Sequence, residues 1–113
     1  MIAHRQVPRY VAELPCAVSQ PPGASPLHTK LVNLSISGCC LEGADALQVK
    51  QECEIAFEWG GRQFRAEAAV TWKSSRGEAG LKFLYIDPSH QDLLRSVCAN
   101  LRLQPIGRPL ESP

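Results

Sequence analysis

The chain has 113 residues, with 44% apolar and 20% charged side chains and a formal net charge of +1. This length suits one domain around one hydrophobic core, and the composition excludes disordered and collagen-like chains. No apolar run approaches the roughly 18 residues of a membrane-spanning helix, and the N-terminus lacks the apolar core of a signal peptide. We therefore expect a cytoplasmic protein without membrane insertion.

The charges are spread unevenly along the chain. Residues 42–58 carry five carboxylates and one lysine, a net charge of −4. Such a segment repels the phosphate backbone of DNA or RNA, so we do not expect a general nucleic-acid binder.

The cysteines provide no metal or disulfide motif. They lack a C-x-x-C pair, and two of them, Cys39 and Cys40, are adjacent. Adjacent side chains on a strand point to opposite faces and cannot chelate one ion together. We interpret all of them as reduced, small core residues and expect no metal: Cys16, Cys39, Cys40, Cys53 and Cys98.

The first half of the chain favours short strands. Residues 10–19 and 28–34 are compatible with β structure, and the proline-rich residues 20–26 between them predict an exposed loop. Residues 38–41 predict a further short strand.

The middle of the chain carries the clearest β pattern. Apolar and polar side chains alternate over residues 52–59 and again over 63–72, and the pair Gly60-Gly61 between them is able to take positive φ. These features predict a hairpin. Residues 80–85 extend it as a third strand.

In that third strand, the alternation predicts that Leu81, Phe83 and Tyr85 share one face. Residues 88–103 then carry helix-start signals and apolar side chains at helical spacing, which predict one amphipathic helix. Residues 104–113 are punctuated by proline and glycine and predict a flexible tail. The fold class is mainly β, a barrel or sandwich of short strands closed by a C-terminal helix.

No constellation for catalysis is present. The three histidines, His4, His28 and His90, stand in no recognisable motif, and there is no phosphate-binding glycine-rich loop. We do not expect an enzyme.

Two polar clusters interrupt the apolar β pattern. Arg5 and Arg9 form an R-x-x-x-R element, and Asn33, Ser35 and Gly38 form N-x-S-x-x-G. Arginine binds phosphate bidentately, reads the O6/N7 edge of guanine and stacks on purines, so its natural partner is a guanine nucleotide. The second cluster offers an amide, a small hydroxyl, and a glycine where a ligand approaches the backbone closely.

Taken alone, each cluster fits a solvated surface or a strand-to-turn connection better than a ligand site. In this order, ahead of a β-meander and a terminal helix, they resemble the PilZ family, whose signature is R-x-x-x-R followed by [D/N]-x-S-x-x-G. The final-strand pattern of residues 80–83 and the sequence of 70–72 are also similar to that family. The resemblance covers residues 4–103, and we assign 1–103 to the domain.

The resemblance implies a small antiparallel barrel of about six strands with a C-terminal helix. It also implies cyclic di-GMP as the ligand, with Arg5 and Arg9 on guanine and phosphate and with Asn33, Ser35 and Gly38 on its second side. Asn33 stands where aspartate is commoner and cannot offer two carboxylate acceptors to the guanine edge.

Trp72 has two interpretations. Its indole could stack on a guanine base, but its phase along the strand matches Phe64 and Val70, which favours core packing at least equally.

The implied mechanism is a switch in which the N-terminal arm closes over the nucleotide and the new surface meets an effector protein. A ligand-linked homodimer stays open. One alternative is a PilZ-like adaptor for pilus or motility machinery that binds no nucleotide. A second is a barrel for single-stranded nucleic acid, whose binding would weaken steeply with salt.

Overall fold

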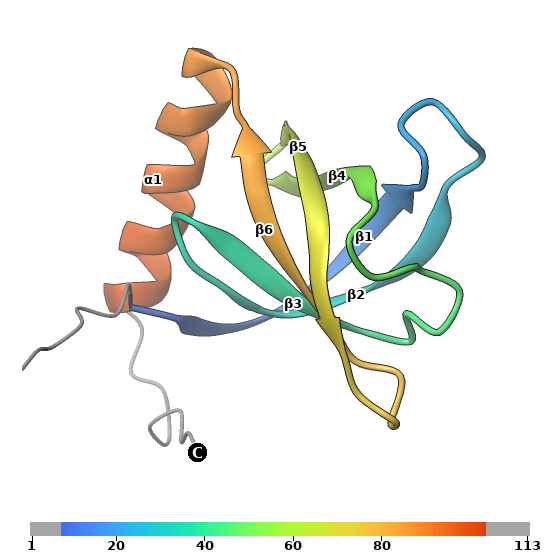
Figure 1. Cartoon of the computed structure of the whole chain (residues 1–113). Coiled ribbons are helices and arrows are strands. Elements are labelled where there is room, and N and C mark those ends of the chain that lie inside the picture. The colour runs from blue at the N-terminus through green and yellow to red at the C-terminus, as the bar shows by residue number, and fades with distance from the viewer. Residues whose placement is uncertain (1–7, 104–113) are drawn as a thin grey trace, which may run out of the picture.

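The computed structural model describes residues 8–103, which form six strands and one helix (Figure 1). The elements in chain order are β1 (Tyr10–Ser19), β2 (Leu27–Leu34), β3 (Gly38–Glu42), β4 (Glu52–Trp59), β5 (Arg62–Lys73), β6 (Ala79–Tyr85) and α1 (Pro88–Leu103). The predicted mainly β fold with a C-terminal helix is confirmed. Arg5 and the tail predicted over residues 104–113 lie outside the described residues.

The strands close into an antiparallel barrel in the order β1-β2-β3-β6-β5-β4. Closure falls between β1 and β4, where only residues 16–19 of β1 are paired. Helix α1 packs against β5 and β1, along one side of the barrel (Figure 1). Asp87 caps its first turn, because the side-chain Oδ1 accepts the N–H of Ser89 at 3.3 Å.

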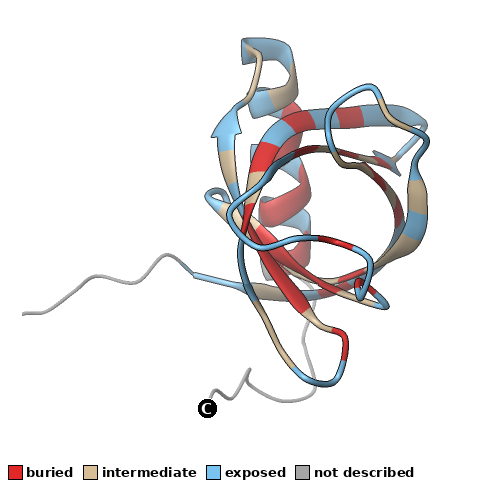
Figure 2. Ribbon diagram, turned by 45° about the vertical axis from the view of Figure 1, so that its right-hand side comes forward, coloured by how far each residue is buried: buried red, intermediate tan, exposed pale blue. Residues whose placement is uncertain are grey.

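The core lies inside the barrel and extends under α1, as the buried segments in Figure 2 show. Phe64 is fully buried at its centre, with ring centroids 4.8 Å from Phe57 and 5.7 Å from Phe83. The buried face of α1 is the one that the helical spacing predicts: Leu94, Val97, Cys98 and Leu101, with Leu93 beside them. No helix among the described residues combines the length and the apolar character needed to cross a membrane.

The β4–β5 hairpin follows the sequence pattern throughout. Its eight residue pairs run from Glu52↔Ala69 to Trp59↔Arg62 without a shift. Gly60 and Gly61 form the turn with φ of 58° and 78°, the left-handed region that glycine enters without steric cost.

Register shifts elsewhere determine the faces of two side chains. On β6, Leu81 is buried but Tyr85 is 59% exposed, because a shift at Leu84 turns Tyr85 to the outside. On β5, Val70 pairs with Leu81 and Trp72 with Gly80, so Thr71 is an extra residue and Trp72 points outward. The prediction that Tyr85 shares the face of Leu81 is wrong. Of the two interpretations of Trp72, core packing is excluded, and stacking on a base stays a prediction.

All five cysteines are buried, as predicted, and none forms a disulfide. Cys39 belongs to the interior cluster, whereas Cys40 lies on the outer side of β3 and is not part of the core cluster. Burial raises the pKa of Cys16 to about 12 and that of Cys53 to about 11. These thiols stay protonated at neutral pH.

Candidate functional site

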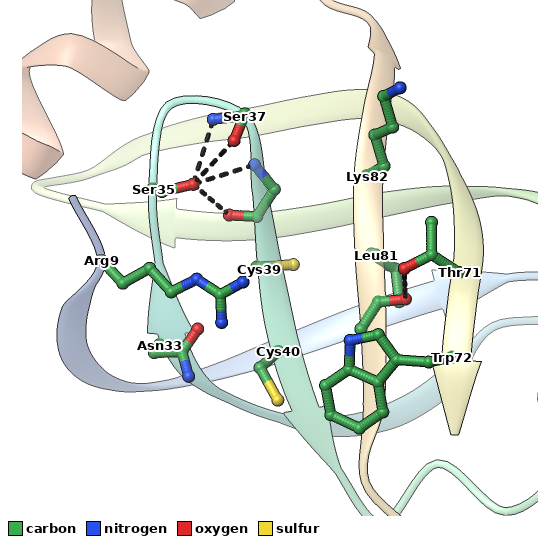
Figure 3. A pocket seen from close by; sticks show the side chains of 12 residues that line it. Arg9, Asn33, Ser35, Ser37, Cys39, Cys40, Thr71, Trp72, Leu81 and Lys82 are labelled. Carbon is green, nitrogen blue, oxygen red and sulfur yellow. Dashed lines mark hydrogen bonds between the residues drawn. The ribbon is translucent and has the colours of Figure 1, made fainter. Parts of the chain in front are cut away.

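An open pocket lies on the outer surface of the barrel, where β2, β3, β6 and the end of β5 meet (Figure 3). Its cavity volume is about 260 Å³. We call it the outer pocket, and its lining residues are Arg9, Asn33, Ser35, Ser37, Gly38, Cys39, Cys40, Thr71, Trp72, Gly80, Leu81 and Lys82. The predicted site residues within the described chain all line it.

Strand register explains why residues so far apart in sequence meet here. Val11 pairs with Asn33, Asn33 with Cys40, Cys40 with Gly80, and Gly80 with Trp72. These residues form one continuous row across five strands, which we call the outer row. Arg9 precedes β1 at one end of the row, and Trp72 stands at the other.

A register shift brings Asn33 onto this row. Leu31 pairs with Leu41 and Asn33 with Cys40, so Val32 is the extra residue of β2. Without the extra residue, the two-residue period would turn Asn33 to the same side as Leu31, which is fully buried. The shift therefore delivers a polar amide to the pocket.

Ser35 holds the turn between β2 and β3. It is 4% exposed, and its Oγ accepts the N–H groups of Ser37 and Gly38, both at 3.1 Å. The hydroxyl also lies 3.3 Å from the Gly38 carbonyl and 3.2 Å from the Ser37 Oγ. The hydroxyl accepts two hydrogen bonds, from Ser37 and Gly38, and can donate its proton to the Gly38 carbonyl. Contacts within the turn therefore satisfy the hydrogen-bonding capacity of Ser35.

Gly38 is required by the backbone of the neighbouring strand. A Cβ atom at this position would collide with the Leu81 carbonyl oxygen and lie 3.3 Å from Lys82 Cα. The prediction from sequence gave this glycine the role of admitting a ligand. In the structure, the absence of a side chain at Gly38 allows β6 to pack closely against β3, and these two strands form the floor of the pocket.

Trp72 and Gly80 form the far wall of the pocket. The indole of Trp72 lies over Gly80, and the side chain is 40% exposed. Thr71, the extra residue beside it, lies with its Oγ1 3.2 Å from the Gly80 carbonyl oxygen. The register shift thus places the aromatic side chain of Trp72 in the lining of the pocket.

Arg9 supplies positive charge at the opposite side. Figure 3 shows its guanidinium beside Asn33 and pointing toward β3. Within residues 8–103, no carboxylate forms an ion pair with Arg9. Burial raises the pKa of the neighbouring Cys40 thiol and Glu78 adds to this, whereas the charge of Arg9 lowers it.

Sequence reasoning missed several lining residues. Lys82 is an exposed cation on β6, and Cys40 and Gly80 form the floor between Arg9 and Trp72. The pattern of residues 80–83 pointed to this strand, but only the register between strands places it beside the polar clusters. Thr71 could not be predicted as a lining residue, because no local sequence pattern marks the extra residue of a strand.

A second, smaller pocket on the outside of β4 and β5 is acidic. Glu54, Glu67 and Asp87 line it together with Arg65, Tyr85 and His90. Among the described residues, no group of three or more histidine, cysteine or carboxylate side chains is arranged to hold a metal ion.

These features define a small closed barrel that carries a cationic and aromatic pocket on its outer surface. The sequence matches the PilZ domain family model over residues 3–100. The chain belongs to the PilZ family, a family of cyclic di-GMP receptor domains.

Several solved structures share this fold. The Bacillus subtilis inhibitor of motility MotI/DgrA matches with a TM-score of 0.72 and 24% identity over 90% of this chain, which spans 53% of that protein. The PilZ domain of YcgR from Escherichia coli with c-di-GMP matches with a TM-score of 0.70 and 18% identity, covering 88% of this chain and 92% of that one. The PilZ domain of CeSA from a cellulose-synthesizing bacterium matches with a TM-score of 0.68 and 14% identity, covering 83% and 97%. No curated protein matches the sequence.

Proposed function

We propose that this chain is a receptor for cyclic di-GMP that binds the dinucleotide in the outer pocket and signals to a partner protein. The N-terminal arm carrying Arg5 closes over the ligand and presents the new surface to that effector, and a ligand-linked homodimer is one form of the output.

The charge of the pocket lining is the observation that carries this proposal. The lining contains two cations, Arg9 and Lys82, and no carboxylate. The neighbouring acidic pocket shows the opposite balance. A lining of this kind favours an anion such as a phosphodiester and excludes cationic ligands.

The remaining groups fit a purine base. Trp72 offers an aromatic face, and base–aromatic stacking contributes roughly 1–3 kcal/mol. Arg9 can meet the O6/N7 edge of guanine or a phosphate with paired N–H donors. Asn33 adds one amide acceptor and one amide donor in the same pocket.

The size of the pocket supports a role for the arm. A cavity of about 260 Å³ lies just under the roughly 300–1,000 Å³ typical of small-molecule sites. The described residues therefore enclose part of a dinucleotide. We assign the rest to the N-terminal arm, where Arg5 provides the second guanidinium.

The Ser35 geometry refines the roles that the family resemblance gives to the second motif. Since the Ser35 hydroxyl is occupied by the turn, we propose that Ser35 and Gly38 act by shaping the pocket. Direct polar contacts from that motif then fall to Asn33.

Isothermal titration of the purified chain with cyclic di-GMP tests the proposal. Arg9→Ala should weaken binding by roughly 1.5–3 kcal/mol, because it removes a charge-assisted contact, while the fold is retained. Arg76→Ala is the matched control, since Arg76 is an exposed arginine outside the pocket lining. GTP serves as the specificity control.

Saturable binding that Arg9→Ala weakens and Arg76→Ala preserves would support the receptor. Absence of heat with a folded protein would overturn it and leave a PilZ adaptor that acts through protein contacts alone. Unfolding of Arg9→Ala would show that Arg9 is structural instead.

A further inference from the structure

Gly80 has no backbone reason to be glycine. Of the seven glycines within residues 8–103, five have positive φ, and Gly80 is not among them. It lies inside strand β6, where glycine is unfavourable because it packs no side chain and loses more conformational entropy than other residues. Another feature of the fold must require the missing side chain.

The indole of Trp72 occupies the space that a Cβ atom on Gly80 would take. That atom would lie 2.5 Å from Cε2 and 2.8 Å from Cδ1 of the ring, and Nε1 would be nearer still. Carbon atoms in van der Waals contact stand roughly 3.5–4.0 Å apart. Even a methyl group at this position therefore displaces the ring.

The register shift on β5 explains why the indole lies there. The extra residue Thr71 turns Trp72 to the outer surface, directly opposite Gly80. The ring then lies against the backbone of β6 at Gly80, while Trp72 remains 40% exposed and lines the pocket. Cys40, the next residue of the outer row, pairs with Gly80 and forms the adjoining part of the pocket floor.

We infer that Gly80 is a positioning residue for ligand binding: its missing side chain seats the Trp72 indole as the aromatic wall of the outer pocket. The inference rests on the proposed function for its consequence in binding, but the seat itself is a property of the ligand-free protein. Gly38 differs, because its missing Cβ faces the Leu81 backbone and no aromatic ring.

The first experiment measures the seat without ligand. The chain contains two tryptophans, so Trp59→Phe leaves Trp72 as the sole tryptophan emitter. In that background, Gly80→Ala should move the indole off β6 and shift both its emission maximum and its quenching by acrylamide. Unchanged emission and quenching would overturn the inference.

The second experiment is a double-mutant cycle on cyclic di-GMP affinity. Trp72→Ala should lower affinity by roughly 5- to 150-fold, the range expected for loss of one stacked base, and Gly80→Ala should lower it to a similar extent. Adding Gly80→Ala to Trp72→Ala should change affinity by less than about twofold. Equal losses with and without the indole would show that Gly80 acts on the ligand or strand directly, and would sink the inference.

The stability of the variants provides a third test. If Gly80→Ala alone unfolds the chain, the double variant Trp72→Ala/Gly80→Ala should fold as stably as Trp72→Ala, because the clashing ring is absent. A double variant that also fails to fold would contradict the inference that Gly80 positions the Trp72 indole. If the wild-type protein does not bind cyclic di-GMP, the proposed function fails while the ligand-free fluorescence still decides on Gly80.

Discussion

Eight consecutive pairs join β4 to β5 without a register shift, whereas each of the ladders β1–β2, β2–β3 and β5–β6 contains at least one. The regular ladder carries the aromatic core around Phe64. The irregular ladders bring Asn33 and Trp72 to the outer pocket, whose floor is the regular pairing of β3 with β6. Each extra residue reverses which face the next side chains occupy, and this is how Asn33 and Trp72 reach the outer surface.

The difference suggests a division of labour within one small barrel. The regular hairpin supplies Phe57 and Phe64 at the aromatic centre of the core, and the bulged strands turn Asn33 and Trp72 toward the outer pocket. Substitutions in the two regions should therefore separate stability from binding.

The largest expected effect is on the regular side. Phe64→Ala removes a fully buried ring that contacts Phe57 and Phe83, and should lower the free energy of unfolding by about 3–5 kcal/mol. Urea denaturation followed by far-UV circular dichroism measures this loss. The affinity of the folded fraction for cyclic di-GMP should stay within a few-fold of wild type, and a collapse of binding in the folded fraction would break the proposed division.

Ser35→Ala tests the bulged side. It removes the acceptor for the N–H groups of Ser37 and Gly38, and should lower the free energy of unfolding by roughly 1–3 kcal/mol. Because the turn shapes the pocket, affinity should fall as well.

The matched control is Ser37→Ala, an exposed neighbour whose hydroxyl contacts only the Ser35 Oγ among the hydrogen bonds described for it. Its effect on stability should stay within about 0.5 kcal/mol. A similar loss in both serine variants would argue that Ser35 has no special place in the turn.

The smallest effect should appear at alkaline pH. Burial raises the pKa of Cys16 to about 12 and of Cys53 to about 11 from an ordinary value of 9.0, so these thiols ionise in the unfolded chain before they do in the folded one. Their contribution is complete below about pH 9 and is lost as the pH rises toward these values. At pH 10 the loss should be roughly 1 kcal/mol for each thiol.

Urea unfolding at pH 8 and pH 10 measures this loss. The variant Cys16→Ala/Cys53→Ala serves as the reference, because it retains every other titrating group. If wild type and variant lose the same stability between the two pH values, the buried thiols are not the cause.

The regular parts of the fold could be predicted from sequence, and the irregular parts could not. Alternation, the glycine pair and the helical spacing determine the hairpin and α1, because each is a local pattern with one periodicity. The motif of Asn33, Ser35 and Gly38 marked the pocket correctly as a region. The predicted face of Tyr85 was wrong and the phase of Trp72 favoured the core interpretation that the structure excludes, because a single extra residue reverses the alternation and leaves no trace in composition.

The roles of individual pocket residues also depended on the third dimension. Gly38 and Gly80 look alike in sequence, yet one meets a backbone carbonyl and the other an indole. Both contacts join strands that are distant in the chain or shifted in register, so a local pattern cannot distinguish them.

Closure of the barrel between β1 and β4 has its own consequence for hydrogen exchange. That seam holds four residue pairs, Cys16↔Phe57 to Ser19↔Glu54, as many as β2–β3 and β3–β6 and fewer than the other three ladders. The outer row crosses β1, β2, β3, β6 and β5 and never touches β4. A ligand confined to the row would make no contact across the seam to β4, so amide exchange at these four pairs measures how often the barrel opens at the point farthest from direct ligand contacts.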